Sequence, residues 1–327
     1  MSDEASNPKL PRNPGSRVAI MGECMVELSL PQGLTSSARL AASFSYGGDT
    51  FNTALYMARL GGRVAYLTAL GDDTISDWLL SQWQAERVDT ALVERFPGSL
   101  PGLYAIETDD AGERCFHYWR NQAPVRQLFD DPDRRQRIFD RLADADVIYF
   151  TGISMSLFSD QSLQYWLDFL THFKHSGGVI AFDSNYRPRQ WPDPDRARQL
   201  FAQAYSLADI ALPTLEDEAL LYPGESSNSL MERLRAYDAS ELVVKQGVEG
   251  CTLFHADMQT QCPLENPVKA LDTTAAGDSF NAGYLIGRLR GLDCVEAVSL
   301  GQQLAGTVVQ HRGAIIPMAS MPTATKQ

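Results

Sequence analysis

Short apolar runs alternate with helical segments along most of this chain, and no other feature restricts its fold as much. The first run, Arg17–Met21, is stopped by Gly22-Glu23 and predicts a buried strand inside a sheet. Comparable runs recur at positions 63–69, 146–151, 178–183, 210–213 and 242–245. Strands that alternate with helices predict an α/β fold with a doubly wound, mainly parallel sheet flanked by helices.

Helical periodicity fills the gaps between these runs. Apolar residues at helical spacing predict a helix from Phe51, which Asp49 or Thr50 is able to cap and which Gly61-Gly62 ends. Further helices are predicted at positions 76–86, 161–175, 194–207, 229–237 and 293–309.

Two regions interrupt the alternation. Residues 25–46 and 103–119 have the composition of strands, and the second region folds around 108–113, a typical hairpin turn sequence. Strands that the main sheet does not need predict a small β-strand lid over its edge. We expect a disordered tail at 1–16 and a single domain at 17–320, with lid strands from about 25–46 and 100–120.

The composition of the chain limits which partners it can bind and where in the cell we expect it. Lys and Arg number 28 against 41 Asp and Glu, a net charge of −13 that disfavours nucleic acid and acidic membrane surfaces. No apolar stretch approaches the roughly 18 residues of a membrane span, and the first sixteen residues have no signal-peptide core, so we expect a cytoplasmic protein. The five cysteines are widely spaced and predict buried or half-buried thiols rather than disulfides or a zinc site.

Several common nucleotide-binding and hydrolytic motifs are missing from the sequence. It contains no GxGxxG, no Gly-Lys pair for a Walker A loop, no GxSxG and no HExxH. His172 and His175 are three residues apart, but the helix that carries them is predicted to face solvent. Dinucleotide enzymes, P-loop enzymes, α/β-hydrolases and zinc hydrolases are therefore disfavoured.

The strongest local signal is the segment 272–285, DTTAAGDSFNAGYL, in which small residues lead directly into a helix. Unpaired amides at such a helix start bind an anion well. Asp278 lies in the first turn, where it could simply stabilise the helix dipole. The alternative is that it accepts a proton from a hydroxyl while the adjacent amides stabilise a transferring phosphoryl group.

This segment resembles the C-terminal signature of the ribokinase, or PfkB, family of carbohydrate kinases. Residues 47–54, GGDTFNTA, resemble the N-terminal signature of the same family, and the two lie in the expected order. Five further segments resemble the branch that phosphorylates a keto-deoxy sugar acid: residues 22–28, 101–104, 118–121, 183–189 and 312–314. The resemblance extends from about residue 18 to residue 317.

The resemblance implies a role for each matching residue in catalysis and sugar binding. Asp278 would be the base, and the amides of Ala275, Ala276 and Gly277 the anion hole. The implied sugar-binding residues are Gly48, Asp49, Thr50, Phe51, Asn52, Tyr104, Tyr118, Arg120 and Arg187, together with Asp278. Taken without the resemblance, the glycines could form only a turn, the tyrosines could be ordinary strand residues and the arginines could pair with surface carboxylates.

For ATP, the resemblance implies Asn185, Arg187, Lys245, Gly247, Gly250 and Gln302, in addition to the anion hole. Lys245 could instead be a solvated strand end. Mg²⁺ is expected with ATP because it neutralises phosphate charge. The family's Asn-x-x-Glu motif is replaced here, with Thr214 and Asp217 in the corresponding places. Asp217 is therefore the candidate metal residue, with Glu216 and Glu218 as alternatives, and a monovalent cation near Asp272 and Thr274 is a further possibility.

The two arginines suit an acidic sugar, because a guanidinium pairs bidentately with a carboxylate. The resemblance implies transfer of the ATP γ-phosphate to the terminal hydroxyl of 2-dehydro-3-deoxy-D-gluconate. The alternatives are a fructokinase- or ribokinase-type kinase of a neutral sugar, and a non-catalytic sugar-binding regulator. Exposed edges of the lid strands predict a homo-oligomer.

Overall fold

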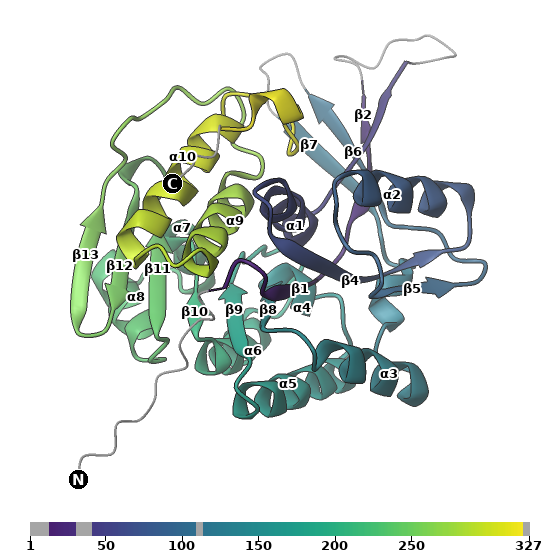
Figure 1. Ribbon diagram of the computed structural model, residues 1–327, viewed down its shortest axis with the longest axis horizontal. Coiled ribbons are helices and arrows are strands. Elements are labelled where there is room, and N and C mark those ends of the chain that lie inside the picture. Colours follow the sequence, from purple (N-terminus) through teal and green to yellow (C-terminus); the bar gives the residue numbers. More distant parts are fainter. Residues whose placement is uncertain (1–12, 31–40, 109–113, 323–327) are drawn as a thin grey trace.

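The structure is a computed structural model that describes residues 13–30, 41–108 and 114–322. Its centre is a sheet of nine strands in the order β13-β12-β11-β10-β9-β8-β1-β4-β5 (Figure 1). In the order of the sheet they are β13 (Met258–Cys262), β12 (Cys251–His255), β11 (Glu241–Lys245), β10 (Ile210–Ala211), β9 (Val179–Asp183), β8 (Val147–Thr151), β1 (Arg17–Met21), β4 (Arg63–Gly71) and β5 (Val93–Phe96). All neighbouring pairs are parallel except β11–β12 and β12–β13. The predicted mainly parallel sheet is confirmed.

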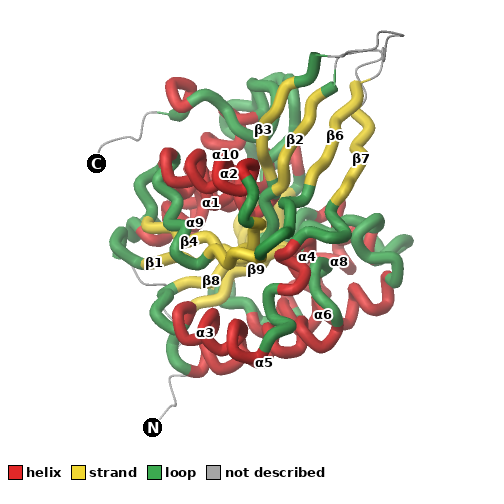
Figure 2. Tube along the Cα trace, turned by 90° about the vertical axis from the view of Figure 1, so that its right-hand side faces the viewer, coloured by secondary structure: helices red, strands yellow, loops and turns green. Residues whose placement is uncertain are grey.

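Helices cover both faces of this sheet, as Figures 1 and 2 show. One face carries α1 (Asp49–Arg59), α2 (Thr74–Ala85), α9 (Ala276–Leu289) and α10 (Cys294–Val308). The other carries α3 (Pro132–Leu142), α5 (Asp160–His175), α6 (Pro194–Leu207), α7 (Leu215–Leu221) and α8 (Ser227–Arg235). The short α4 (Gly152–Met155) follows β8 directly.

Each strand of the sheet contributes alternate side chains to the two layers. In β1, Val18 and Ile20 join the core beneath α1 and α9, whereas Ala19 and Met21 join the core beneath α5 and α6. All four are at most 1% exposed. The continuous apolar composition of the strand follows from burial on both faces.

The strands predicted for a lid form a separate four-stranded sheet in the order β3-β2-β6-β7. They are β3 (Ser43–Gly47), β2 (Met25–Ser29), β6 (Leu103–Thr108) and β7 (Arg114–Trp119). Figure 2 shows this sheet standing at one edge of the α/β body. The predicted hairpin turn falls mainly on residues 109–113, which lie outside the described part, as do residues 31–40 and residues 1–12 of the predicted tail.

Some local predictions are wrong. Neither Asp49 nor Thr50 caps α1, because the N-cap is Gly48 and both residues lie within the helix. Cys115 is exposed, whereas the other four thiols are buried and all five are free. Strands β5, β12 and β13 and helices α3 and α7 were not predicted. β13, with the sequence MQTQC, is largely exposed and lacks the apolar run of a buried strand.

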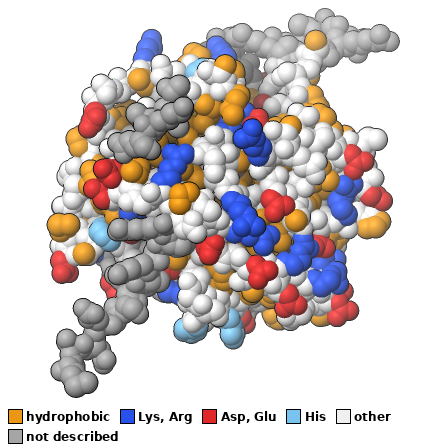
Figure 3. Space-filling view, viewed as in Figure 1, with side chains coloured by type: hydrophobic (Ala, Val, Ile, Leu, Met, Phe, Trp, Pro, Cys, Tyr) orange, Lys and Arg blue, Asp and Glu red, His pale blue; other side chains and the backbone are white. Residues whose placement is uncertain are grey.

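The surface agrees with the charge balance of the sequence. On the face drawn in Figure 3, acidic and basic side chains are interspersed and form no continuous basic surface. Among the described residues, no helix is both long and apolar enough to cross a membrane.

Candidate active site

The start of α9 is open to a ligand. Its N-cap, Ala275, has a left-handed φ of 60° and provides no side-chain cap. The Ala276 amide donates to the Thr273 carbonyl at 3.2 Å, so this amide of the predicted anion hole is already engaged. The Gly277 amide has no acceptor within the described residues. Gly277 therefore offers an amide at this helix start that is available to an anion, as do Ala275 and Asp278, whose amides also have no acceptor within the described residues.

Asp278, in the first turn of α9, does not use its carboxylate as a helix cap. Oδ2 accepts a hydrogen bond from Asn52 Nδ2 at 2.8 Å, which joins the two predicted signature segments across 226 residues. Burial raises the pKa of Asp278 to about 8, the negative charge of Asp49 acts in the same direction, and the Asn52 hydrogen bond opposes both. A carboxylate whose pKa is raised toward the working pH is well suited to exchange a proton.

Asn52 reaches Asp278 because α1 begins close to β2. A Cβ on Gly48 would lie 2.1 Å from the Glu23 carbonyl, so only glycine permits this approach of the chain. Asn52 is 4% exposed, and its Oδ1 has no hydrogen-bond partner in the described structure. This oxygen is therefore free to accept a hydrogen bond from a sugar hydroxyl.

Thr50 and Phe51, also predicted to bind sugar, point into the core. Both side chains are fully buried. The Thr50 hydroxyl lies 3.0 Å from the Tyr66 hydroxyl, and the Phe51 ring packs 4.9 Å from that of Trp83. Only their main-chain atoms are left for a ligand.

Asp49 lies on the inner side of the site. Its Oδ2 accepts hydrogen bonds from Thr151 Oγ1 at 2.6 Å and from Asn185 Nδ2 at 3.0 Å. Burial raises the pKa of Asp49, and the Thr151 hydrogen bond opposes that rise. Asn185 thus lies against Asp49, and its predicted contact with the nucleotide stays a prediction.

The lid contributes two tyrosines on one face. Tyr104 and Tyr118 are directly opposite each other on β6 and β7, with ring centroids 6.0 Å apart. Tyr104 is buried and donates to Glu27 Oε2 at 2.5 Å, whereas Tyr118 is 43% exposed. Of the two phenols, Tyr118 is the one with a free surface for a ligand.

Both predicted arginines already have carboxylate partners. Arg120 is 6% exposed, and its Nη2 lies 2.5 Å from Glu23 Oε2. Arg187 donates from Nη1 to Asp217 Oδ1 at 2.7 Å, with its side chain 47% exposed. Arg187 is therefore open to a further ligand, whereas Arg120 is mostly enclosed.

Arg189 adds a third guanidinium to this region. Burial raises the pKa of Tyr118, and the positive charges of Arg120, Arg189 and Arg187 oppose the rise, so all three lie around that phenol. Arg189 is exposed and has no ion-pair partner within the described residues. Arg189, on the loop after β9, is thus a cation near Tyr118 that has no carboxylate partner among the described residues.

The predicted nucleotide loop follows β11. Lys245 is 7% exposed and binds Asp183, so it is not a solvated strand end. Gly250 has a φ of 91°, and a Cβ there would lie 2.2 Å from the Cys262 carbonyl. The turn from Gly247 to Gly250 therefore requires a glycine at its end.

Gln302 lies on α10 beside this loop. Its Nε2 donates to the Cys262 carbonyl at 2.8 Å, and the residue lines a cavity of about 980 Å³ along α10. The cavity is also lined by Val268 and Gly306, but its lining does not include Asp278. A ligand in it would lie along α10 rather than at the catalytic carboxylate.

The three acidic residues of α7 differ in what they can reach. Glu218 is 1% exposed and accepts a hydrogen bond from Tyr205 at 2.6 Å, and burial raises its pKa to about 7. Glu216 faces Gly247, with 3.6 Å between its Oε1 and the position of a Cβ there. Asp217 keeps Oδ2 free of hydrogen bonds within the described residues, and burial raises its pKa with Asp183 adding to the rise.

Asp272 and Thr274, the candidate residues for a monovalent cation, are joined by a hydrogen bond. Asp272 Oδ1 accepts from the Thr274 hydroxyl at 2.7 Å, and Asp272 Oδ2 accepts from the Gly313 amide at 2.6 Å. Both carboxylate oxygens of Asp272 are thus engaged.

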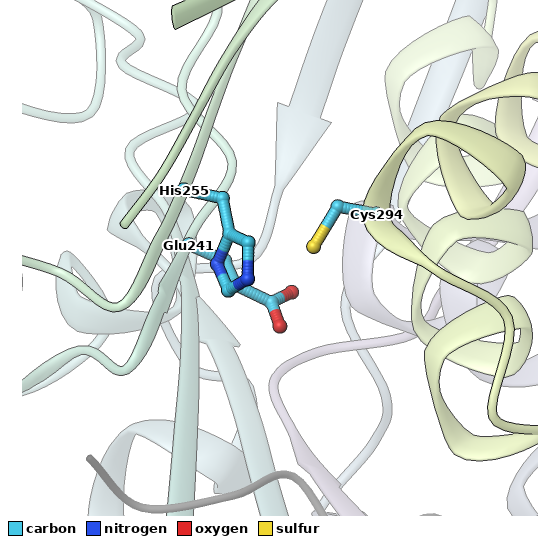
Figure 4. A group of neighbouring side chains, drawn as sticks. All are labelled: Glu241, His255 and Cys294. Atoms are coloured by element: carbon cyan, nitrogen blue, oxygen red, sulfur yellow. The ribbon is translucent and has the colours of Figure 1, made fainter. Parts of the chain in front are cut away.

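A second cluster with metal-ligand side chains lies away from this site. Glu241, His255 and Cys294 point toward one another from β11, β12 and α10, with ligand atoms within 4.8 Å (Figure 4). The Arg288 guanidinium already lies 2.6 Å from Glu241, and burial raises the pKa of Cys294 to about 11. A divalent ion here would face a buried cation and a neutral thiol, so we interpret the cluster as structural.

Several residues of the site were not singled out from the sequence: Glu23, Thr151, Asp183, Arg189 and Asn281. Glu23, Thr151 and Asp183 lie at or just after the carboxyl ends of β1, β8 and β9. In open parallel sheets ligands bind at this edge, so polar residues at the ends of predicted strands were the available signal.

Known proteins share this architecture. A putative ribokinase II of Escherichia coli superposes with a TM-score of 0.80 at 23% identity, covering 94% of this chain and 96% of that one. A ribokinase of Thermotoga maritima superposes with a TM-score of 0.72 at 21% identity, with 94% and 96% covered. The fold is therefore ribokinase-like, with a small lid sheet.

The amino-acid sequence also resembles those of known carbohydrate kinases. The model of the pfkB family carbohydrate kinases matches residues 16–321. The chain is 41% identical to a 2-dehydro-3-deoxygluconokinase of Dickeya dadantii, with 93% of this chain and 98% of the relative covered. A 2-dehydro-3-deoxygluconokinase of Escherichia coli is 40% identical, with 94% and 99% covered, and a fructokinase of Klebsiella pneumoniae is 29% identical, with 83% and 84% covered. The chain belongs to the pfkB family of carbohydrate kinases.

Proposed function

We propose that this chain transfers the γ-phosphate of ATP to the terminal hydroxyl of 2-dehydro-3-deoxy-D-gluconate, which gives the 6-phosphate. The relatives at 40–41% identity carry this activity in their names and match almost end to end. The observation that carries the proposal is Asp278, a carboxylate of raised pKa held by Asn52 beside the open amide of Gly277.

Each part of the site has a task in this reaction. Asp278 would take the proton of the attacking hydroxyl, and the Gly277 amide would stabilise charge on the phosphoryl oxygens. The free Oδ1 of Asn52 would fix another sugar hydroxyl. With the sugar oriented in this way, the barrier falls because the hydroxyl is already next to its base.

The carboxylate of the sugar acid would be bound by the arginines of the loop after β9, which lie close to Tyr118 of the lid. Arg187 would share its guanidinium between Asp217 and the substrate, and the unpaired Arg189 would add a second contact. Arg120 would act mainly by keeping buried Glu23 ionised, because burial raises the pKa of Glu23 and Arg120 opposes this rise. Tyr118 would cover the sugar from the lid.

The nucleotide would lie between the loop after β11 and α10. Gly247 and Gly250 shape the loop, and Gln302 lies at the adjacent cavity. Mg²⁺ would be held through Asp217, whose Oδ2 is free in the described structure, and would supply neutralisation of phosphate charge. A putative ribokinase II of the same fold has been solved in complex with ATP and Mg²⁺. The monovalent cation, the homo-oligomer and the cytoplasmic location stay predictions.

A panel of sugars and sugar acids with ATP, read by coupled ADP formation, tests the proposal. We expect kcat/KM for 2-dehydro-3-deoxy-D-gluconate to exceed that for fructose and ribose by at least about 100-fold, because a neutral sugar leaves the guanidinium groups without a partner. Preference for a neutral sugar would refute the substrate assignment. Absence of turnover with every member would favour the non-catalytic alternative.

A further inference from the structure

Lys245, at the end of β11, is enclosed by the protein rather than extended toward solvent. Its ammonium donates to Asp183 Oδ2 at 2.7 Å and to Asn281 Oδ1 at 3.1 Å. Lys245 and Asp183 are 7% and 2% exposed. A buried ion pair of this kind is expensive to form and needs further hydrogen bonds to hold it in place.

Those further bonds come from Asn281, one turn after Asp278 on α9. Asn281 is fully buried, and its Nδ2 donates to Asp183 Oδ2 at 2.7 Å and to the Tyr149 hydroxyl at 3.0 Å. Side chains from β8, β9, β11 and α9 thereby fix one another. The ammonium of Lys245 has little freedom to move.

The network holds this ammonium directly beneath the start of α9. A Cβ on Gly277 would lie 3.5 Å from Lys245 Nζ, so the charge is next to an amide that is open to an anion. The positive end of the helix dipole and a buried cation therefore coincide at this point. Because the surroundings exclude water, the charge acts more strongly than an exposed lysine would.

We infer that Lys245 is a positioning residue, held by Asp183 and Asn281, whose buried charge favours the ionised form of Asp278 and strengthens the anion site at Gly277. The inference rests on the proposed role of Asp278 as the base. This role differs from that of a lysine that simply contacts the nucleotide, because the effect of Lys245 passes through Asp278 and the start of α9.

Several charged or titratable groups face Asp278 from the elements packed around it: Asp49 on α1, Asp183 on β9, Lys245 on β11, Arg187 after β9, Tyr56 on α1 and Tyr149 on β8. Asp49 and Asp183 raise the pKa of Asp278, whereas Lys245 lowers it. Removal of Lys245 and removal of Asp183 should therefore shift the pKa of Asp278 in opposite directions. A purely structural ion pair predicts no such opposition.

The test compares Asp183→Asn, Lys245→Met and the double variant by the pH dependence of kcat/KM, with both substrates below their KM. We expect the acidic limb to move up by about one pH unit in Lys245→Met and down by at least as much in Asp183→Asn, because the charge of Asp183 acts on Asp278 at least as strongly as that of Lys245. Lys245→Met leaves buried Asp183 unpaired and is the variant that can fail to fold. The difference between Asp183→Asn and the double variant isolates the ammonium without that problem, and we expect the double variant to lie about one unit higher.

A second measurement needs no turnover. Asp278→Asn is added to each of these variants, and thermal stability is measured with and without it across pH. The pH at which the difference in stability is half developed reports the pKa of Asp278 in that variant. Equal pH midpoints in the Asp183→Asn background and in the double-variant background would overturn the inference. So would kinetics in which the loss of Lys245 raises the KM for ATP but leaves the acidic limb of the pH profile where it is. If wild type lacks kinase activity, the proposed function fails, while the stability midpoints still decide the role of Lys245.

Discussion

Two carboxylates next to α9 have very different surroundings: half-buried Asp278 in its first turn, and buried Glu241 on β11, which contacts the last turns of the helix. Glu241 accepts hydrogen bonds from the Tyr284 hydroxyl at 2.6 Å and from Arg288 Nη2 at 2.6 Å, so a cation lies in contact with it. Asp278 receives a single side-chain hydrogen bond within the described residues, from the neutral amide of Asn52. Its nearest carboxylate neighbours raise its pKa further.

The difference separates a carboxylate that holds the structure together from one that is kept reactive. A buried charge in direct contact with a guanidinium stabilises folding only as a pair. The Asp278 carboxylate, with one side-chain donor and a pKa raised to about 8, can gain or lose a proton near that pH. The fold is thus expected to accept a cost in stability at Asp278 that it avoids at Glu241.

The largest expected effect is on turnover at Asp278. Asp278→Asn keeps the shape and the contact with Asn52 but removes the base, so we expect kcat to fall by about 1,000-fold while the KM for the sugar acid changes by less than about threefold. Steady-state kinetics with coupled ADP detection measures both. The matched control is Asp133→Asn, an exposed position on α3. Turnover within tenfold of wild type would refute the role as base.

The reverse pattern is expected at Glu241. Arg288→Met leaves the carboxylate buried without its cation, so we expect a loss of about 3–5 kcal/mol in the free energy of unfolding while kcat stays within about twofold. Urea denaturation gives the first value and the kinetic assay the second. Arg137→Met, at an exposed position on α3, is the control. A loss below about 1 kcal/mol in the free energy of unfolding would show that the ion pair of Glu241 and Arg288 does not stabilise the fold.

Asp278→Asn should also change stability, and in the opposite sense to Arg288→Met. The folded pKa of Asp278 is raised, so the wild type loses stability as pH increases from the unfolded value of 3.8 to about 8. We expect the variant to gain about 1–3 kcal/mol over wild type near pH 8, with the gain shrinking toward pH 4. Thermal unfolding across this range measures it, and a gain that does not vary with pH would contradict the raised pKa.

The smallest effect is expected at Arg189, on the loop after β9. Arg189→Gln removes an exposed guanidinium, so we expect the KM for the sugar acid to rise about five- to tenfold while kcat/KM for any neutral sugar that is accepted stays the same. Arg137→Gln serves as the control. Equal losses on acidic and neutral sugars would show that Arg189 does not recognise the carboxylate.

The sequence predicted the fold well where burial on both faces left a clear pattern. Apolar runs such as Arg17–Met21 have one interpretation, and the lid was recognised because its strands interrupt the alternation. β13 was missed because it is an edge strand with largely exposed side chains and carries little apolar signal. The first residues of α1 were misread as caps because a glycine in extended conformation takes that place.

The site was predicted less evenly, for a physical reason. Asp278 and Asn52 lie in recognisable motifs, and the structure brings them to 2.8 Å. A sequence does not show which carboxylate neutralises which cation, so the pairing of Arg120 with Glu23 and of Lys245 with Asp183 became visible only in three dimensions. Both cations are buried against carboxylates, and their contacts with the sugar and with ATP stay predictions.

The pH dependence of kcat/KM for the sugar acid tests the central claim most directly. With both substrates below their KM, the profile reports the free protein, in which Asp278 must be ionised to accept a proton. The account predicts that activity falls tenfold per pH unit below an apparent pKa of about 8, and that this limb is absent from the residual activity of Asp278→Asn. A profile that stays flat down to pH 5 would contradict it.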